Sequence, residues 1–350
     1  MLNHQKNKKM NKKIYILLDY DNRFYSEWDK NEFNLNRFIE LLCDDGFEVE
    51  LLKFSEINFQ KINFNNKIIL YSSCEVGEYK NYIEDVLLGI VKQGGILIPN
   101  FYLFRAHHNK SFQEIYKKIL NFGNLEGRSF GSFKEFLDNL QNVEFPLVLK
   151  IPNGSGSKKI YLPKNYQEAK RIAKRISSSF DSIIKKIYFS TRATIAYLMG
   201  IRDKERIYRN NTKKFVAQKY IPNLKNDWKV LIYGEHYYAL KRGIRKNDFR
   251  ASGSHNFVYV DPPNELLDFC EKIFKKLKTP YLSLDVAIKK NKCYLLEFQA
   301  LYFGMYTILH ANSYYKKEKN IWIKKIKKNS VEKEMVKSIL KFTNDNIEKK

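Results

Sequence analysis

A lysine followed by a loop of small residues is the first feature of this sequence that could do chemistry. Lys150 ends the apolar stretch FPLVLK, and the loop NGSGSKK follows at residues 153–159. Backbone N–H groups of such a loop can surround an anion, and a lysine at the end of a buried strand is costly unless an anion pairs with it. The two features together predict a nucleotide phosphate site. An ordinary hairpin turn is the alternative, since no GxxxxGK(S/T) pattern is present and no helix opens directly after the loop.

Two carboxylates and an amide lie in neighbouring apolar stretches further along the chain. Asp285 lies within LSLDVAI, and Glu297 and Gln299 lie within LLEFQA. Residues two apart on a strand point to the same face, so Glu297 and Gln299 project together. Two acids on adjacent strands repel each other unless a cation lies between them or one is protonated. Such hard oxygen ligands suit Mg²⁺, which also binds substrate phosphates; a pair of hydrogen-bonded structural acids is the alternative.

A cluster of cations occupies the stretch ALKRGIRKNDFRASGS. It contains Lys241, Arg242, Arg245 and Arg250. Strand alternation prevents Lys241 and Arg242 from sharing a face, so we expect one of them to point to a phosphate and the other elsewhere. Phosphoryl transfer needs positive charge around the moving group, and the planar fork of arginine supplies it. A solvated basic loop is the alternative.

The first third of the chain alternates short apolar runs with amphipathic stretches. Residues 13–20, 66–73 and 96–100 predict buried strands. Residues 34–47 and 78–95 predict helices, each closed by glycine. Strands alternating with helices are typical of a parallel, right-handed α/β sheet.

The pattern of predicted elements changes after about residue 130 and favours antiparallel strand pairing. The stretch at 236–243 follows 227–234 after a two-residue link, which predicts a hairpin, and a second hairpin is predicted across Lys290-Asn291. The other predicted elements are strands at 145–152, 160–163, 214–221, 281–290 and 292–300, and helices at 166–177 and 263–278.

These motifs, in this order, resemble the ATP-grasp superfamily, and within it the branch of ribosomal-protein glutamate ligases, glutathione synthetases and D-alanine–D-alanine ligases. The resemblance covers roughly residues 96–305. Lys150 and its loop are similar to the strand lysine and the phosphate-covering loop of the family, and Asn109-Lys110 is similar to a pair that opens a helix leading from the first domain. The resemblance implies that ATP is bound by Lys110, Lys150, Asn153, Gly154, Ser155, Gly156 and Lys241.

Three further segments carry the resemblance. FVAQKYI is similar to the segment whose backbone receives the adenine, which implies contacts from Gln218, Lys219, Tyr220 and Ile221. Asp227-Trp228-Lys229 stands where the family has Asp-x-Arg, and NDFRASGS resembles a Phe-Arg-x-Asn-Gly stretch. The resemblance implies catalytic positions at Arg242, Arg250 and Ser252, and Mg²⁺ ligands at Asp285, Glu297 and Gln299.

The chain departs from the family pattern at three positions. Gln299 replaces the usual Asn and keeps a carbonyl oxygen, but on a longer side chain. Lys219 stands where many members have Glu for the adenine amine, which leaves that contact to backbone groups. Ser252 replaces an Asn that helps to hold substrate or metal. These departures weaken the metal assignment more than the nucleotide assignment.

The resemblance implies an α/β (α+β) fold in which a parallel α/β domain precedes a two-lobed ATP-grasp domain with antiparallel sheets. We expect a basic tail at 1–13, the first domain at 14–105, the ATP-grasp domain at 106–310 and a basic helical segment at 311–350. The two lobes would span about 106–212 and 213–310. The C-terminal segment has apolar residues at helical intervals over 320–342, and packing on the body is favoured over a homodimer contact or an anionic surface.

The implied activity is ATP- and Mg²⁺-dependent joining of a carboxylate to an amine through an acyl phosphate. The carboxylate would belong to a small molecule, a sugar or a peptide, and similar proteins accompany polysaccharide- or peptide-modifying enzymes. Two alternatives stay open: an ATP-grasp kinase that phosphorylates without ligation, and a basic protein that binds nucleic acid.

Composition decides little between these functions. The net charge is +25, but residues 1–13 carry +5, residues 313–329 carry +6 and residues 330–350 carry +1, so about half of it lies in the tails. The remaining lysines are spread among Asn and Ile, as in a low-GC genome, and nucleic acid is not the favoured partner. The four cysteines form no CxxC pair, and no apolar run reaches the roughly 18 residues of a membrane span. A cytoplasmic protein with reduced thiols is the expectation.

Overall fold

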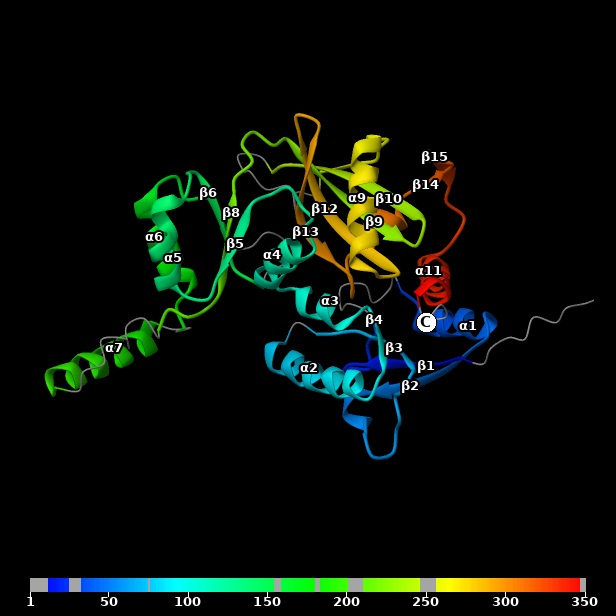
Figure 1. Ribbon diagram of the computed structural model, residues 1–350, viewed down its shortest axis with the longest axis horizontal. Helices are drawn as coiled ribbons and strands as arrows, with labels where there is room; N and C mark the ends of the chain where they lie inside the picture. Colours follow the sequence, from blue (N-terminus) through cyan, green and yellow to red (C-terminus); the bar gives the residue numbers. More distant parts are fainter. Residues whose placement is uncertain are drawn as a thin grey trace, which may run out of the picture. The chain divides into compact units, whose positions relative to one another are not determined.

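The computed structural model describes residues 12–24, 33–74, 76–153, 159–179, 183–200, 210–245 and 256–346. The chain divides into two compact units (Figure 1). The first contains Met1–His107, Asp227–Arg242 and Phe257–Lys350, and the second contains His108–Asn226 and Gly243–Asn256. Each unit is built around its own sheets. No helix in the described ranges is long and apolar enough to cross a membrane.

A parallel sheet opens the first unit and confirms the predicted α/β pattern. Its strands are β1 (Lys12–Leu18), β2 (Phe47–Lys53), β3 (Ile68–Tyr71) and β4 (Ile96–Ile98), in the order β2-β1-β3-β4. The connecting helices are α1 (Leu35–Asp44) and α2 (Gly77–Lys92), and α3 (Phe101–Ala106) follows β4. Strand β2 was not predicted. It is an edge strand with half-exposed positions at most residues after Phe47, so its apolar pattern is weak.

Both faces of the parallel sheet are covered, as the alternation along β1 requires. Ile14 and Ile16 lie in one apolar cluster with Phe38 of α1, whereas Tyr15 and Leu17 lie in a second cluster with residues of α2. The first cluster also contains Val331, Met335, Val336 and Ile339 of the C-terminal helix α11 (Val331–Asn346). Figure 1 shows α11 beside α1. The last helix of the chain therefore completes the core of its first sheet.

The antiparallel sheet of the first unit carries both predicted hairpins. Its strands run in the order β13-β12-β9-β10-β14-β15, and β11 (Phe257–Val258) pairs with β10. Helix α9 (Asn264–Leu277) packs against β12 and β13, and α10 is short (Tyr306–Leu309). The bounds of the six ordered strands are β9 Asn226–Tyr233, β10 His236–Gly243, β12 Tyr281–Lys289, β13 Lys292–Gln299, β14 Ser313–Glu318 and β15 Ile321–Ile326.

The segment expected to be helical after residue 311 begins instead as the hairpin β14–β15, and only Val331–Asn346 is helical. The turn residues Lys319 and Asn320 have φ values of 48° and 67°, close to those of Lys290 and Asn291 in the other hairpin (48° and 59°). Two successive residues with positive φ are typical of the type I′ turns that join paired strands. The Lys-Asn dipeptide was thus the turn signal at both places.

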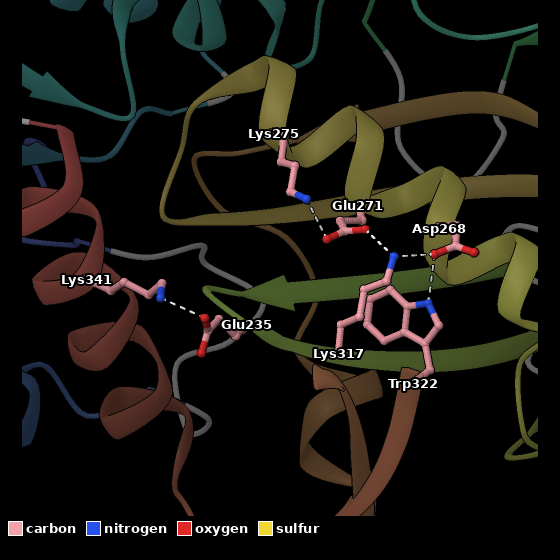
Figure 2. A network of polar contacts seen from close by, with 7 residues as sticks. All are labelled: Glu235, Asp268, Glu271, Lys275, Lys317, Trp322 and Lys341. Carbon is pink, nitrogen blue, oxygen red and sulfur yellow. Dashed lines mark hydrogen bonds and ion pairs between the residues drawn. The ribbon is translucent and has the colours of Figure 1, made fainter. Parts of the chain in front are cut away.

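Polar contacts fix this hairpin to α9 (Figure 2). The Nζ of Lys317 lies 2.7 Å from Asp268 and 2.9 Å from Glu271, and the indole N–H of Trp322 donates to Asp268 at 3.0 Å. Nearby, Lys341 of α11 bonds to Glu235 in the β9–β10 turn at 2.7 Å. The hairpin and α11 are therefore tied to the antiparallel sheet at separate points.

The second unit contains a small antiparallel sheet of order β5-β8-β6-β7. Helices α5 (Phe133–Asn139) and α6 (Tyr166–Ile176) supply an apolar cluster on one face, and α4 (Lys110–Ile119) contacts β5 and β8. Helix α7 spans Ile183–Leu198. The strands are β5 Gly127–Phe130, β6 Leu147–Lys150, β7 Ile160–Tyr161 and β8 Phe215–Lys219.

Candidate functional site

The predicted Mg²⁺ ligands gather on one face of the antiparallel sheet in the first unit. The register of β12 and β13 places Asp285 opposite Glu297, and Ser283 opposite Gln299. Asp285 also lies opposite Lys229 of β9. Because directly opposite residues share a face, the two carboxylates are neighbours, as the short predicted turn required. Their binding of a metal stays a prediction.

Arg242 joins the carboxylates of two strands. Its Nε donates to Oδ1 of Asp227 at 2.7 Å, and its Nη2 donates to Oδ2 of the same residue at 2.9 Å. Nη2 also lies 2.9 Å from Oδ2 of Asp285. The side chain of Arg242 is only 7% exposed. A buried guanidinium with two carboxylates around it has its donors occupied by protein groups, so Arg242 acts on the position of Asp285.

Burial and neighbouring charges together shift the pKa values of two groups in this cluster. Burial alone would lower the pKa of Arg242, but the charges of Asp285 and Asp227 outweigh burial and raise it. Burial raises the pKa of Asp227, because the charge and hydrogen bonds of Arg242 offset only part of the desolvation. Arg242 is therefore a fixed cation at every physiological pH.

Lys229 supplies the second positive charge on this face. Its Nζ lies 3.7 Å from Oδ1 of Asp285 and donates to the hydroxyl of Ser283 at 3.0 Å. It occupies the position of the arginine in the Asp-x-Arg pattern. Lys229 and Arg242 thus approach Asp285 from different strands.

Lys241 does not join this group. Arg242 faces Asp227 and Asp285, so strand alternation turns Lys241 to the opposite face. There its Nζ lies 5.8 Å from the centre of the ring of Trp228, a cation–π distance. Of the two adjacent cations, Arg242 is the one on the face with the carboxylates, and neither Lys241 nor its aromatic partner contributes to that face.

The oxygen ligands on this face fit Mg²⁺. Within the described ranges, no group of three or more His, Cys, Asp or Glu side chains forms a complete cage. Mg²⁺ does not need one, since it is commonly held by one or two carboxylates together with substrate phosphates and water. Asp285 and Glu297 would be those carboxylates. Gln299 has its amide nitrogen 3.5 Å from Oε1 of Glu297, so its carbonyl oxygen would face the same ion after the amide turns over.

The predicted phosphate lysine lies in the second unit, on the face of the small sheet that α4 approaches. The Nζ of Lys150 donates to Oε1 of Gln218 at 2.6 Å, and Nε2 of Gln218 donates to Oε1 of Glu114 at 3.0 Å. Lys117 also bonds to Glu114, at 2.5 Å. Lys110 is the first residue of α4 and is 8% exposed. Its backbone N–H donates to the carbonyl of Pro152 just before the predicted loop, at 3.2 Å.

The other predicted nucleotide residues are distributed around β8. Lys219 alternates with Gln218, lies opposite Leu147 and pairs with Glu144 at 3.1 Å. Strand alternation turns its side chain away from the face of Lys150, and it lines a cavity of ≈ 460 Å³ with Arg128 and Gln218. Tyr220 and Ile221 follow the strand, and Asn153 follows β6. Five predicted site residues lie outside the described residues: Gly154, Ser155, Gly156, Arg250 and Ser252.

By sequence the chain matches no protein-family model and no curated protein. By structure it is similar to D-cycloserine synthetase DcsG, with a TM-score of 0.58, 9% identity and coverage of 94% of this chain and 99% of that one. The chain has the ATP-grasp fold. A D-alanine–D-alanine ligase from Bacillus anthracis matches with a TM-score of 0.52 and 14% identity over 97% of this chain and 99% of that one. The ATP-grasp ligase PsnB, solved with a minimal precursor, matches with a TM-score of 0.52 and 11% identity over 95% and 100%. These likenesses confirm the predicted fold class.

Sequence reasoning missed Glu114 and the pairing of Asp227 with Arg242. Asp227 was singled out only as part of the Asp-x-Arg pattern, although the two-residue hairpin link places it opposite Arg242. That register was a usable signal. Glu114 had none, because a glutamate in an amphipathic helix is usually solvated.

Proposed function

We propose that this protein is an ATP- and Mg²⁺-dependent ligase that joins a carboxylate to an amine through an acyl phosphate. The observation that carries the proposal is the neighbouring pair Asp285 and Glu297, with Arg242 hydrogen-bonded beside them. This arrangement supplies oxygen ligands for Mg²⁺ and a fixed cation on one sheet face. Several solved proteins of the same fold are named as ligases, which supports the same reaction class.

The residues of the second unit meet the other requirement of the reaction, which is positive charge for the phosphates. We assign Lys150 and Lys110 to the phosphates of ATP, and the backbone around Gln218 to Ile221 to the adenine. Asn153 and the loop that follows it would cover the phosphates. Lys241 is left out of this set because it lies on the opposite sheet face from Asp285.

In the proposed reaction, a carboxylate oxygen attacks the γ-phosphorus of ATP and ADP leaves. The amine nitrogen then attacks the acyl carbon, phosphate leaves with the bonding electrons, and the nitrogen loses a proton. When bound, Mg²⁺ would neutralise phosphate charge. The protein residues hold and orient: Lys150 binds phosphate oxygens, Arg242 fixes Asp285, and Arg250 is proposed to steady the acyl phosphate. Fixed charges of this kind lower the barrier because they need no reorganisation.

A substrate class is part of this proposal, and it is drawn from a solved protein of the same fold. We favour a peptide carboxylate, since PsnB was solved with a precursor peptide. A cytoplasmic location remains part of this proposal.

The proposal is tested by measuring ADP release with Mg²⁺, pooled carboxylates and pooled amines. Lys150→Ala and Glu297→Ala should each lower turnover by about a hundredfold or more, the size of one lost electrostatic contact in a transition state. Lys61→Ala and Glu48→Ala are matched controls, since both residues are exposed on the parallel-sheet domain, and should turn over normally. Wild-type turnover in Lys150→Ala or Glu297→Ala would refute that residue's role. ADP release that no amine stimulates would instead favour the kinase alternative.

A further inference from the structure

We infer that Glu114 is a positioning residue that orients Lys150 through Gln218, an inference that deepens the proposed ATP site and rests on it. The three side chains form one chain of hydrogen bonds, from Lys150 to Gln218 at 2.6 Å and from Gln218 to Glu114 at 3.0 Å. They come from β6, β8 and α4, so this contact links three elements of the second unit. Glu114 is 104 residues from Gln218 in the sequence.

The direction of these bonds is fixed by the carboxylate. A glutamine amide has one accepting end and one donating end. An ionised carboxylate only accepts, so Glu114 takes the donating NH₂ end of Gln218. The accepting oxygen of Gln218 is then turned toward the ammonium of Lys150. The reverse orientation would set the NH₂ group against the ammonium, with donors facing each other.

Burial makes this orientation costly to change. Gln218 is 3% exposed and Glu114 is 5% exposed, so neither can exchange its partner for bulk water. Lys117, which is 4% exposed, also bonds to Glu114 and keeps it from being an uncompensated buried charge. Glu114 therefore has two distinct partners, one for charge balance and one for orientation.

Gly127 leaves space for the carboxylate of Glu114. It lies opposite Gln218 on β5, and a Cβ atom added there would lie 2.2 Å from Oε2 of Glu114. A Cβ atom cannot occupy that position unless the carboxylate moves, so glycine is the residue that leaves the carboxylate where it is. A methyl group at residue 127 should displace the carboxylate without changing any charge.

The effect on ATP follows from the geometry of an ammonium group. Lys150 has three N–H donors, so a bond to Gln218 is compatible with contacts to phosphate oxygens. The bond fixes the direction in which the ammonium is presented. The bond to Gln218 already restricts the conformations of Lys150 before ATP binds. Without this bond, ATP binding itself would have to restrict them, at a cost in conformational entropy.

The experiment compares Glu114→Gln, Gly127→Ala and the control Lys118→Met. Two readouts are taken: the affinity for Mg²⁺-ATP by calorimetry, and the rate at which acetic anhydride acetylates Lys150, measured by peptide mass spectrometry. Glu114→Gln and Gly127→Ala should each weaken ATP binding by about tenfold, the equivalent of about 1.4 kcal/mol, and should raise acetylation of Lys150 several-fold. Lys118→Met, which changes an exposed lysine on the same helix, is the control and should leave both readouts near wild type.

A rescue variant separates orientation from simple damage. In Gly127→Ala, shortening the acid by Glu114→Asp should make room for the methyl group and restore part of the ATP affinity. Unchanged acetylation of Lys150 in both Glu114→Gln and Gly127→Ala would overturn the inference, whatever the ATP result. If wild-type protein binds no Mg²⁺-ATP while acetylation rises as expected, the proposed function fails and the orienting contact stands.

Discussion

Arg242 binds Asp227 through two hydrogen bonds, from Nε to Oδ1 at 2.7 Å and from Nη2 to Oδ2 at 2.9 Å. The pair joins strands β9 and β10 beside Asp285. Both side chains are almost completely buried, at 7% and 6% exposure. The planar fork of arginine matches a carboxylate in a way that a lysine ammonium cannot. The pair is therefore a device for fixing the sheet face that carries the candidate Mg²⁺ ligands.

Breaking this pair from one side should cost more than removing it entirely. Arg242→Met leaves Asp227 and Asp285 without their shared cation, so we expect the free energy of unfolding to fall by about 3–5 kcal/mol. In the double variant Arg242→Met with Asp227→Leu, part of that loss should return. Urea unfolding of the set measures both effects. A loss below about 1 kcal/mol in Arg242→Met would show that the pair is not a buried, coupled one.

The proposed Mg²⁺ site gives a second prediction. Adding EDTA should abolish ADP release, and excess Mg²⁺ should restore it. In Glu297→Gln the missing charge should raise the Mg²⁺ concentration for half-maximal turnover by at least about tenfold. Glu318→Gln, an acid of the β14–β15 hairpin, is the control and should keep the wild-type Mg²⁺ dependence. Equal Mg²⁺ requirements in wild type and Glu297→Gln would contradict the assignment.

The acid sensitivity of the C-terminal helix can be predicted from Glu235. Hydrogen bonds from Lys341 and Lys316 lower the pKa of Glu235 to about 2. A pKa that is lower in the folded state stabilises the fold above the ordinary value near 4.5, and this stabilisation is lost as the pH falls from about 5 to 2. Glu235 is partly exposed, so the gain is below about 1 kcal/mol. The difference in unfolding free energy between wild type and Glu235→Gln should be present at pH 7 and absent at pH 2.

The hairpin β14–β15 should loosen locally when its contacts with α9 are removed. Lys317→Met removes the ion pairs to Asp268 and Glu271, and Trp322→Phe removes the indole donor to Asp268 while keeping an aromatic ring (Figure 2). Amide hydrogen exchange in residues 313–326 should accelerate in each variant, whereas exchange in β1 and β3 should not change. Acceleration across the whole chain would mean that these contacts support global stability instead.

The pairing of the two carboxylates could be predicted from the sequence because it depends only on residues close together in the chain. A short turn brings the strands of Asp285 and Glu297 together, and strand alternation then decides which side chains share a face. The same rule separated Lys241 from Arg242, although it could not say which one joined the acids. Burial beside Asp227 decided that, and it depends on a register between two strands.

Features that depend on distant contacts were not predictable in the same way. Strand β2 is an edge strand with half-exposed acids, so it lacks an apolar period. The isoleucines of 321–326 fitted a helical spacing as well as a strand, and only the Lys319-Asn320 turn distinguishes the two. Glu114 became notable only when Gln218 and Gly127, about 104 and 13 residues away, were seen to surround its carboxylate.

The position of α11 in the core of the first unit determines when that unit can finish folding during synthesis. The backbone N–H of Asn34 donates to Oε1 of Glu332 at 2.8 Å, across 298 residues, and the core that contains Ile14 and Phe38 also contains Met335 and Ile339. Until α11 has left the ribosome, one face of the first sheet lacks one of its covering helices and exposes apolar side chains. The first unit can reach its native structure only after residues 331–346 have left the exit tunnel. Early folding of the N-terminal segment alone would be incomplete, and nascent chains stalled before residue 331 should be substrates for chaperones.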